Sequence, residues 1–127
     1  MQRNVYGNWL DALADPPEML LPEIQVIAAI AKTACAAAID DPQDVNVRKH
    51  LFDVLGDVID PAFVNDDATY PLPVGDLLRE TSAWASLVRC RIENARSSKT
   101  LKSAALIQYP ARDLRQLLSQ LIDELGA

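Results

Sequence analysis

Residues 112–126, RDLRQLLSQLIDELG, hold the clearest structural pattern in the sequence. Apolar side chains recur in this stretch at spacings of three and four residues, which places them on one face of an α-helix. Gly126 follows the last of them, where a helix-ending glycine is common. The stretch therefore predicts an amphipathic helix, and its apolar face consists of Leu114, Leu117, Leu118, Leu121, Ile122 and Leu125.

Two earlier segments, residues 42–60 and 74–96, show the same helical spacing. Asp41 and Pro42 predict the start of the first, because aspartate caps a helix and proline suits its first turn. We also expect a short helix up to Tyr109, with Pro110 kinking or restarting the chain because proline lacks an N–H donor. The expected apolar faces are Val47, Leu51, Val54, Leu55 and Val58 in the first segment, and Leu77, Leu78, Thr81, Ala85, Val88, Ile92 and Ala95 in the second.

Residues 22–39, PEIQVIAAIAKTACAAAI, are apolar or alanine at nearly every position. A helix that is apolar all round is typical of a core, so we expect a central helix with neighbours on most sides. Glu23, Gln25 and Lys32 interrupt it, and we therefore expect no membrane span. We expect residues 1–19 to form a partly irregular arm. This segment carries no apolar run of signal-peptide length, so we also expect a cytoplasmic protein.

The composition also favours helix. Eighteen alanines stand against four glycines, and alanine has the highest helix propensity while glycine has one of the lowest. Residues 61–75 hold three prolines and the run Asn65-Asp66-Asp67, which marks a long turn-rich loop. We therefore predict an all-α fold, a compact bundle of four to five helices built as one domain over residues 1–127.

The sequence offers little for catalysis. His50 is the only histidine, and no phosphate-loop, dinucleotide-binding, zinc-protease or calcium-loop motif occurs. Cys35 and Cys90 are 55 positions apart and form no CxxC pair, so we expect two small core side chains rather than a zinc or redox site. We predict no catalytic residue, no cofactor and no enzymatic activity.

One face of the helix predicted at 42–60 is acidic. His50 is followed by three carboxylates at helical spacing, Asp53, Asp57 and Asp60. Oxygen ligands with one imidazole suit Mg²⁺, Mn²⁺ or Fe²⁺, so whether His50, Asp53 and Asp57 bind a metal stays an open question. A solvated face opposite an apolar stripe explains the same residues, and we expect no metal.

Charge is unevenly distributed along the chain, whose formal net charge is −6. Residues 1–80 contain fourteen acidic and five basic residues, whereas residues 81–127 contain four acidic and seven basic ones. All seven late cations lie in the segment 89–115, which we call the basic segment. Such asymmetry indicates interaction with an anionic partner.

Three interpretations of the basic segment remain open. In the first, its cations pair with acidic helices of the same domain, and Arg89 and Arg91 border an apolar face. In the second, Arg96, Lys99 and Lys102 contact nucleic-acid phosphates near a helix N-terminus. In the third, the segment binds a protein, with head-to-tail homo-oligomers as one form. Its remaining candidate contacts are Arg112 and Arg115.

These patterns favour a small interaction protein, an accessory subunit or regulator that binds a larger protein. One alternative is an acidic inhibitor or immunity-type protein, which would cover a basic or nucleic-acid-binding site through Asp53, Asp57 and Asp60. Another is a helical subunit of a nucleoprotein complex that contacts the phosphate backbone through the basic segment.

Overall fold

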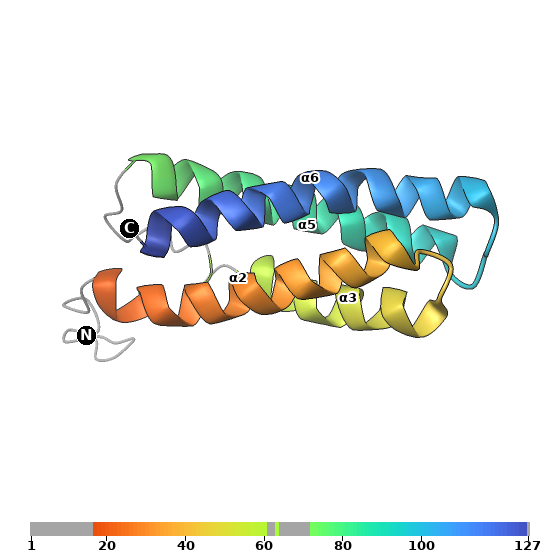
Figure 1. The fold of residues 1–127 in the computed structure, drawn as a ribbon, viewed down its shortest axis with the longest axis horizontal. Coiled ribbons are helices and arrows are strands. Elements are labelled where there is room, and N and C mark those ends of the chain that lie inside the picture. The colour runs from red at the N-terminus through yellow and green to blue at the C-terminus, as the bar shows by residue number, and fades with distance from the viewer. Residues whose placement is uncertain (1–16, 61–62, 64–71, 127) are drawn as a thin grey trace.

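The computed structural model describes residues 17–60, 63 and 72–126 of the chain. It contains α2 (Pro17–Asp40), α3 (Val45–Val58), α5 (Leu72–Ala95) and α6 (Leu101–Gly126). Successive helices run in opposite directions (Figure 1), and α2 and α5 each pack against both α3 and α6. The described residues contain no strand, which confirms the predicted all-α bundle and gives it four described helices.

Two predicted features lie partly outside the described residues. Of the arm predicted over residues 1–19, residues 1–16 lie outside the described part of the chain. Residues 17–19 belong to α2. The loop predicted at 61–75 lies outside them at 61–62 and 64–71. Its last four residues instead begin α5, because Pro73 in the first turn gives up no helical hydrogen bond.

The turn between α2 and α3 corrects the predicted helix start at residue 42. α2 continues through Asp40, and Asp44 rather than Asp41 is the N-cap of α3. The Asp44 Oδ1 atom accepts hydrogen bonds from the backbone N–H groups of Asn46, at 2.8 Å, and Val47, at 3.2 Å. Three aspartates in this short stretch offered competing caps, and the one that satisfies two N–H groups begins the helix.

α6 is continuous from Leu101 to Gly126, so the short helix predicted to end at Tyr109 is wrong and the chain does not restart at Pro110. Proline cannot donate to the carbonyl four residues earlier, which here belongs to Leu106. Nη1 of Arg91, on α5, donates to the Leu106 carbonyl oxygen at 2.9 Å instead. A side chain of the neighbouring helix therefore replaces the hydrogen bond that Pro110 cannot make.

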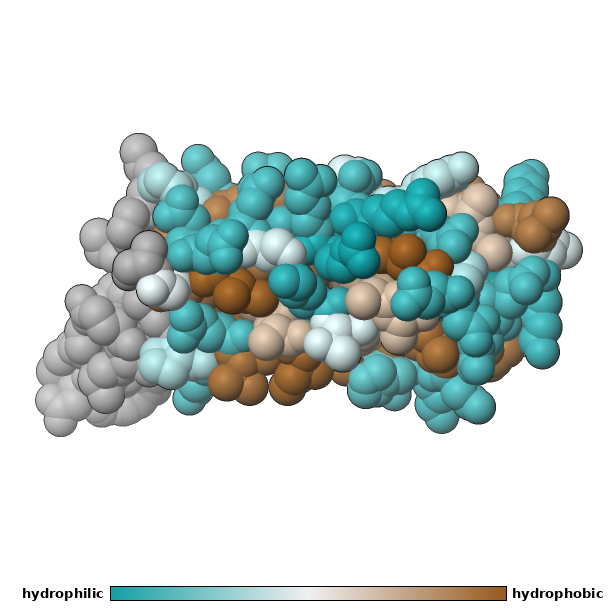
Figure 2. Space-filling view, in the orientation of Figure 1, coloured by the Kyte–Doolittle hydropathy of each residue, from teal (hydrophilic) through white to brown (hydrophobic). Residues whose placement is uncertain are grey.

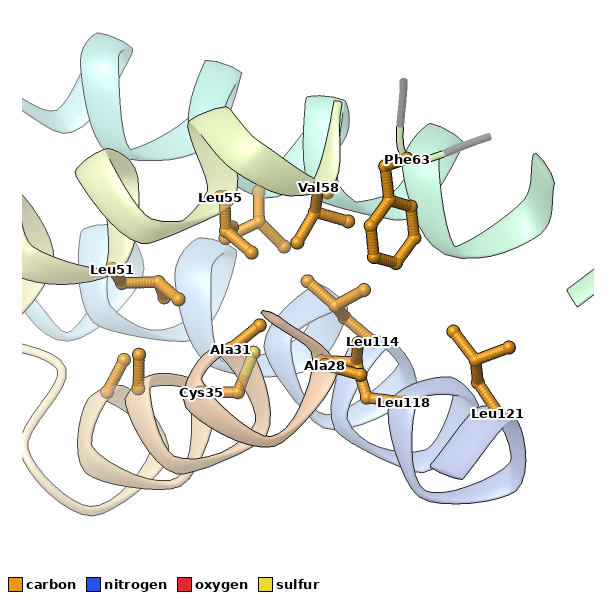
Figure 3. Close-up of a cluster of buried hydrophobic side chains, with 14 of the residues drawn as sticks. Ala28, Ala31, Cys35, Leu51, Leu55, Val58, Phe63, Leu114, Leu118 and Leu121 are labelled. Atoms are coloured by element: carbon orange, nitrogen blue, oxygen red, sulfur yellow. The ribbon is translucent and has the colours of Figure 1, made fainter. Parts of the chain in front are cut away.

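Leucine-rich faces of α3, α5 and α6 supply most of the larger core side chains, as predicted. Figure 3 shows residues of α3 and α6, with Phe63, around the centre of the bundle. Most of the predicted positions on these three helices are fully buried, and the others, such as Val47 and Leu125, are partly buried against the core. The fully buried ones are Leu51, Leu55, Val58, Leu78, Thr81, Ala85, Val88, Leu114, Leu118 and Leu121.

α2 is not the central helix that its apolar sequence predicted. Among the described helices it packs mainly against α3 and α6, and residues on its opposite side, such as Val26 and Ile30, are exposed. Its buried side chains are small, apart from Ile24: they are Ala28, Ala31, Ala34, Cys35 and Ala38. Since alanine lets a neighbouring helix approach closely, α2 can lie against the leucines of α3 and α6 by one face alone (Figure 3).

Within the described part of the chain, one segment has the length and composition of a membrane-spanning helix. This is Pro22–Asp40, the greater part of α2, and about 33% of it is buried inside the bundle. Core helices of bundles and signal sequences share these properties.

The two cysteines differ, which corrects the prediction that both are core residues. Cys35 is buried and Cys90 is exposed. Burial raises the pKa of the Cys35 thiol to about 12, because desolvation disfavours the thiolate, and the positive charge of Arg115 opposes this in part.

We predict that iodoacetamide at pH 8 alkylates Cys90 readily and Cys35 slowly. With its pKa near 12, the Cys35 thiol stays protonated at pH 8, and only the thiolate is nucleophilic. Mass spectrometry of the native protein should show one modified cysteine, and both should react in denaturant. Rapid double modification of the native protein would contradict this arrangement of α2.

Candidate functional site

Two arginines of the basic segment bind main-chain carbonyls. Nε of Arg89 donates to the carbonyl oxygen of Phe52 at 3.0 Å, and the guanidinium lies 3.9 Å from the centre of the Phe52 ring. Arg91 binds the Leu106 carbonyl. Both arginines therefore support helix packing beside the apolar face, as the sequence predicted, but the partners found for them are carbonyls rather than acidic side chains.

Arg48 of α3 is a buried cation that the sequence analysis missed. Its side chain is only 1% exposed, and burial lowers its pKa because desolvation disfavours the charged form. Nε donates to the Pro42 carbonyl at 2.6 Å and Nη1 to the Arg96 carbonyl at 3.2 Å, whereas Nη2 has no partner among the described residues. Arg48 thus ties the α2–α3 turn to the end of α5.

The turn between α5 and α6 carries the exposed cations Arg96 and Lys99, and Lys102 is exposed in the first turn of α6. Arg96 has a φ of 51°, the left-handed conformation in which glycine usually ends a helix, and its N–H donates to the Ile92 carbonyl at 3.1 Å. Nε2 of Gln43 donates to the Lys99 carbonyl at 2.6 Å. The acidic turn after α2 therefore lies against this basic turn, and its charge weakens the local positive potential.

The N-terminus of α6 is capped by the chain itself. Thr100 Oγ1 accepts from the backbone N–H of Ser103 at 3.1 Å and lies 3.0 Å from the Ser103 hydroxyl, which also bonds Ser98 at 2.7 Å. One of the N–H groups on which the predicted phosphate contact depends is therefore occupied. This weakens the case for a phosphate site around Arg96, Lys99 and Lys102.

Arg112 and Arg115 are exposed on α6 and have different surroundings. The Arg112 guanidinium lies 5.8 Å from the centre of the Tyr109 ring. Arg115 faces α2, where it lies close enough to Cys35 to affect its pKa. The two are about one helical turn apart on α6.

The acidic candidates Asp53 and Asp57 are exposed on α3, as is His50, and Asp60 is exposed just after the end of this helix. In the part of the chain that the structure describes, no three His, Cys, Asp or Glu side chains are grouped so that they could hold a metal ion. His50, Asp53 and Asp57 thus share a helix side without forming a metal-binding group.

Large apolar side chains are exposed on α2 and also on α6, where Leu101, Leu106 and Tyr109 are 83%, 41% and 62% exposed. The side chains of Val26 and Ile30 are 58% and 49% exposed, although the same helix buries alanines. Figure 2 shows apolar and weakly polar atoms gathered over α2, whereas hydrophilic atoms cover most of α6. We define the outward face of α2 as the exposed residues Val26, Ala29, Ile30, Thr33 and Ala37.

A shallow hollow of about 480 Å³ adjoins this face, between α2 and α6. Its walls come from both helices and carry two cations, Lys32 and Arg115, and no acidic side chain. The residues that line it are Ala29, Lys32, Thr33 and Ala36 of α2 and Arg115 and Ile122 of α6.

We predict that Arg91→Met lowers the free energy of unfolding by about 1–2 kcal/mol, because the Leu106 carbonyl loses its donor. In a Pro110→Ala background the same change should cost less, since the new alanine supplies a helical N–H to Leu106. Urea denaturation of the four proteins in this double-mutant cycle measures the coupling. Equal losses in both backgrounds would show that Arg91 does not compensate for Pro110.

No protein-family model, curated protein or solved structure matches this chain. Its function is therefore inferred from its own surface.

Proposed function

We propose that this protein is a small, non-enzymatic interaction protein, an accessory subunit or regulator that binds a larger protein through the outward face of α2. The supporting observation is the distribution of side-chain size on this helix. α2 buries Ala28, Ala31 and Ala34 and exposes Val26 and Ile30. Contiguous exposed apolar surface on a small protein is typical of a binding site.

The energetics of this face suit docking. Fully burying a valine or isoleucine side chain is worth about 1.5–3 kcal/mol, so Val26 and Ile30 can act as anchors for a partner. Ala29, Thr33 and Ala37 lie beside them and are small, which lets the backbone of a partner helix approach. The five residues of the face are uncharged, and the exposed carboxylates on the same side of α2, Glu23 and Asp40, lie beyond its two ends. A partner can therefore cover the middle of the face without removing an ion from water.

The two alternatives have less support. Asp53 and Asp57 are exposed on α3, where a charged face opposite the core is ordinary, and Asp60 is exposed just after it. For a nucleoprotein subunit, Arg89 and Arg91 are engaged with carbonyls, and Arg96, Lys99 and Lys102 lie beside an acidic turn. Neither face combines exposed apolar area with a hollow as α2 does.

We predict that the double variant Val26→Lys, Ile30→Lys loses its partner while staying folded. The partner is identified by affinity purification from the native host with mass spectrometry, and its affinity is then measured by calorimetry. Loss of two apolar anchors should weaken binding at least about 30-fold, the equivalent of about 2 kcal/mol.

The matched control is Gln116→Lys, Gln120→Lys, which adds the same charge at exposed positions of α6. It should bind as the unmodified protein does. Retention of the partner by the α2 variant, equal loss in the control, or the absence of any stoichiometric partner would each contradict the proposal.

A further inference from the structure

The hollow between α2 and α6 has a chemistry that narrows the kind of partner. Four of its six lining residues are short or apolar: Ala29, Ala36 and Ile122, together with the methyl-bearing Thr33. The other two are cations, Lys32 from α2 and Arg115 from α6. A binding segment that enters this hollow therefore meets apolar surface and one cation from each helix.

These two cations are available to a ligand. Neither the Lys32 ammonium nor the Arg115 guanidinium has an ion pair or side-chain hydrogen bond to another described residue, and both side chains are exposed. In contrast, Arg48, Arg89 and Arg91 donate to carbonyls. The positive charge of Arg115 already acts on a neighbouring group, since it lowers the pKa of Cys35 against the larger effect of burial.

The net charge of −6 does not prevent an acidic segment from binding here. At physiological ionic strength the Debye length is about 8 Å, so exposed charges farther apart than this are largely screened. Lys32 and Arg115 line the hollow itself, whereas the exposed carboxylates of α2, Glu23 and Asp40, are nine and eight residues from Lys32, roughly 12–14 Å along the helix. The nearest charges therefore determine the preference, and in the lining they are both positive.

Resting on the function proposed above, we propose that the occupant of this surface is an acidic amphipathic helix of the partner protein. Its apolar side chains lie on Val26 and Ile30 and enter the hollow, and its carboxylates pair with Lys32 and Arg115. An apolar helix face held in an apolar groove is a common mode of peptide recognition, and the flanking charges select the partner.

The test is a selection against the immobilised full-length protein. The probe is a displayed library of amphipathic helical peptides with leucines fixed on one face and the flanking positions varied among Glu, Gln and Lys. We expect Glu to be enriched beside the leucines, and a selected peptide with its Glu residues changed to Lys should bind about tenfold more weakly by fluorescence anisotropy. Lys32→Glu combined with Arg115→Glu should reverse the preference to Lys.

The matched control is Lys99→Glu with Lys102→Glu. It makes the same change of charge, at the α5–α6 turn and in the first turn of α6, and it should leave the preference for Glu unchanged. If peptides bind and Ile30→Lys abolishes binding, but Glu and Lys are enriched equally, the acidic partner is wrong and the function of the face stands. If no peptide is enriched, or Ile30→Lys has no effect, both proposals are wrong.

Two other occupants give distinct results. A dimer in sedimentation velocity that Ile30→Lys dissociates would show that a second copy of this chain covers the face. Binding to vesicles of phosphatidylcholine and phosphatidylglycerol with the same dependence on Ile30 would identify a lipid surface. Either result would overturn the acidic helix as occupant.

Discussion

The packing of α2 through small side chains is the constraint on which the architecture depends. α2 fits against α3 and α6 because Ala28, Ala31 and Cys35 leave room for the leucines opposite (Figure 3). Larger side chains at these positions would force the helices apart, since interiors are packed without spare volume. Ile24 is buried and Ile27 packs partly against the core, whereas Val26 and Ile30 lie on the other side of α2 and are exposed. The bundle therefore leaves an exposed apolar surface on this helix.

Main-chain hydrogen bonding explains how the cations are divided between structure and surface. The carbonyls of Pro42 and Arg96, in the two turns, and of Leu106, opposite Pro110 in α6, accept hydrogen bonds from arginines of neighbouring elements. Gln108 acts in the same way, because its Nε2 donates to the Ile39 carbonyl, in the last turn of α2, at 2.8 Å. Backbone carbonyls need donors, so these side chains are held in place by the fold. The side chains of Lys32 and Arg115 make no such hydrogen bond within the described residues, so they remain available to a binding partner.

Sequence periodicity was sufficient for the faces of α3, α5 and α6, because one apolar stripe on each helix distinguishes inside from outside. It failed for α2, since a helix that is apolar nearly all round gives no such contrast; only side-chain size separates Ile30 from Ala31. Arg48 precedes Leu51 by three residues and Leu55 by seven, and this spacing places it on the buried face of the helix. It was missed because a charged side chain is ordinarily expected at the surface. The continuity of α6 at Pro110 depends on Arg91, a tertiary contact that no local pattern predicts.

The central claim is that α2 packs by its alanines and presents its larger apolar side chains to a partner. The adjacent residues Ile30, 49% exposed, and Ala31, 0% exposed, test it most directly. The measurement is the free energy of unfolding in urea for the variants Ile30→Lys and Ala31→Lys. We predict that Ile30→Lys changes the free energy of unfolding by no more than about 0.5 kcal/mol. Ala31→Lys should lower it by at least about 3 kcal/mol, because only this substitution buries a charge. Comparable losses in both variants, or a larger loss at Ile30, would contradict it.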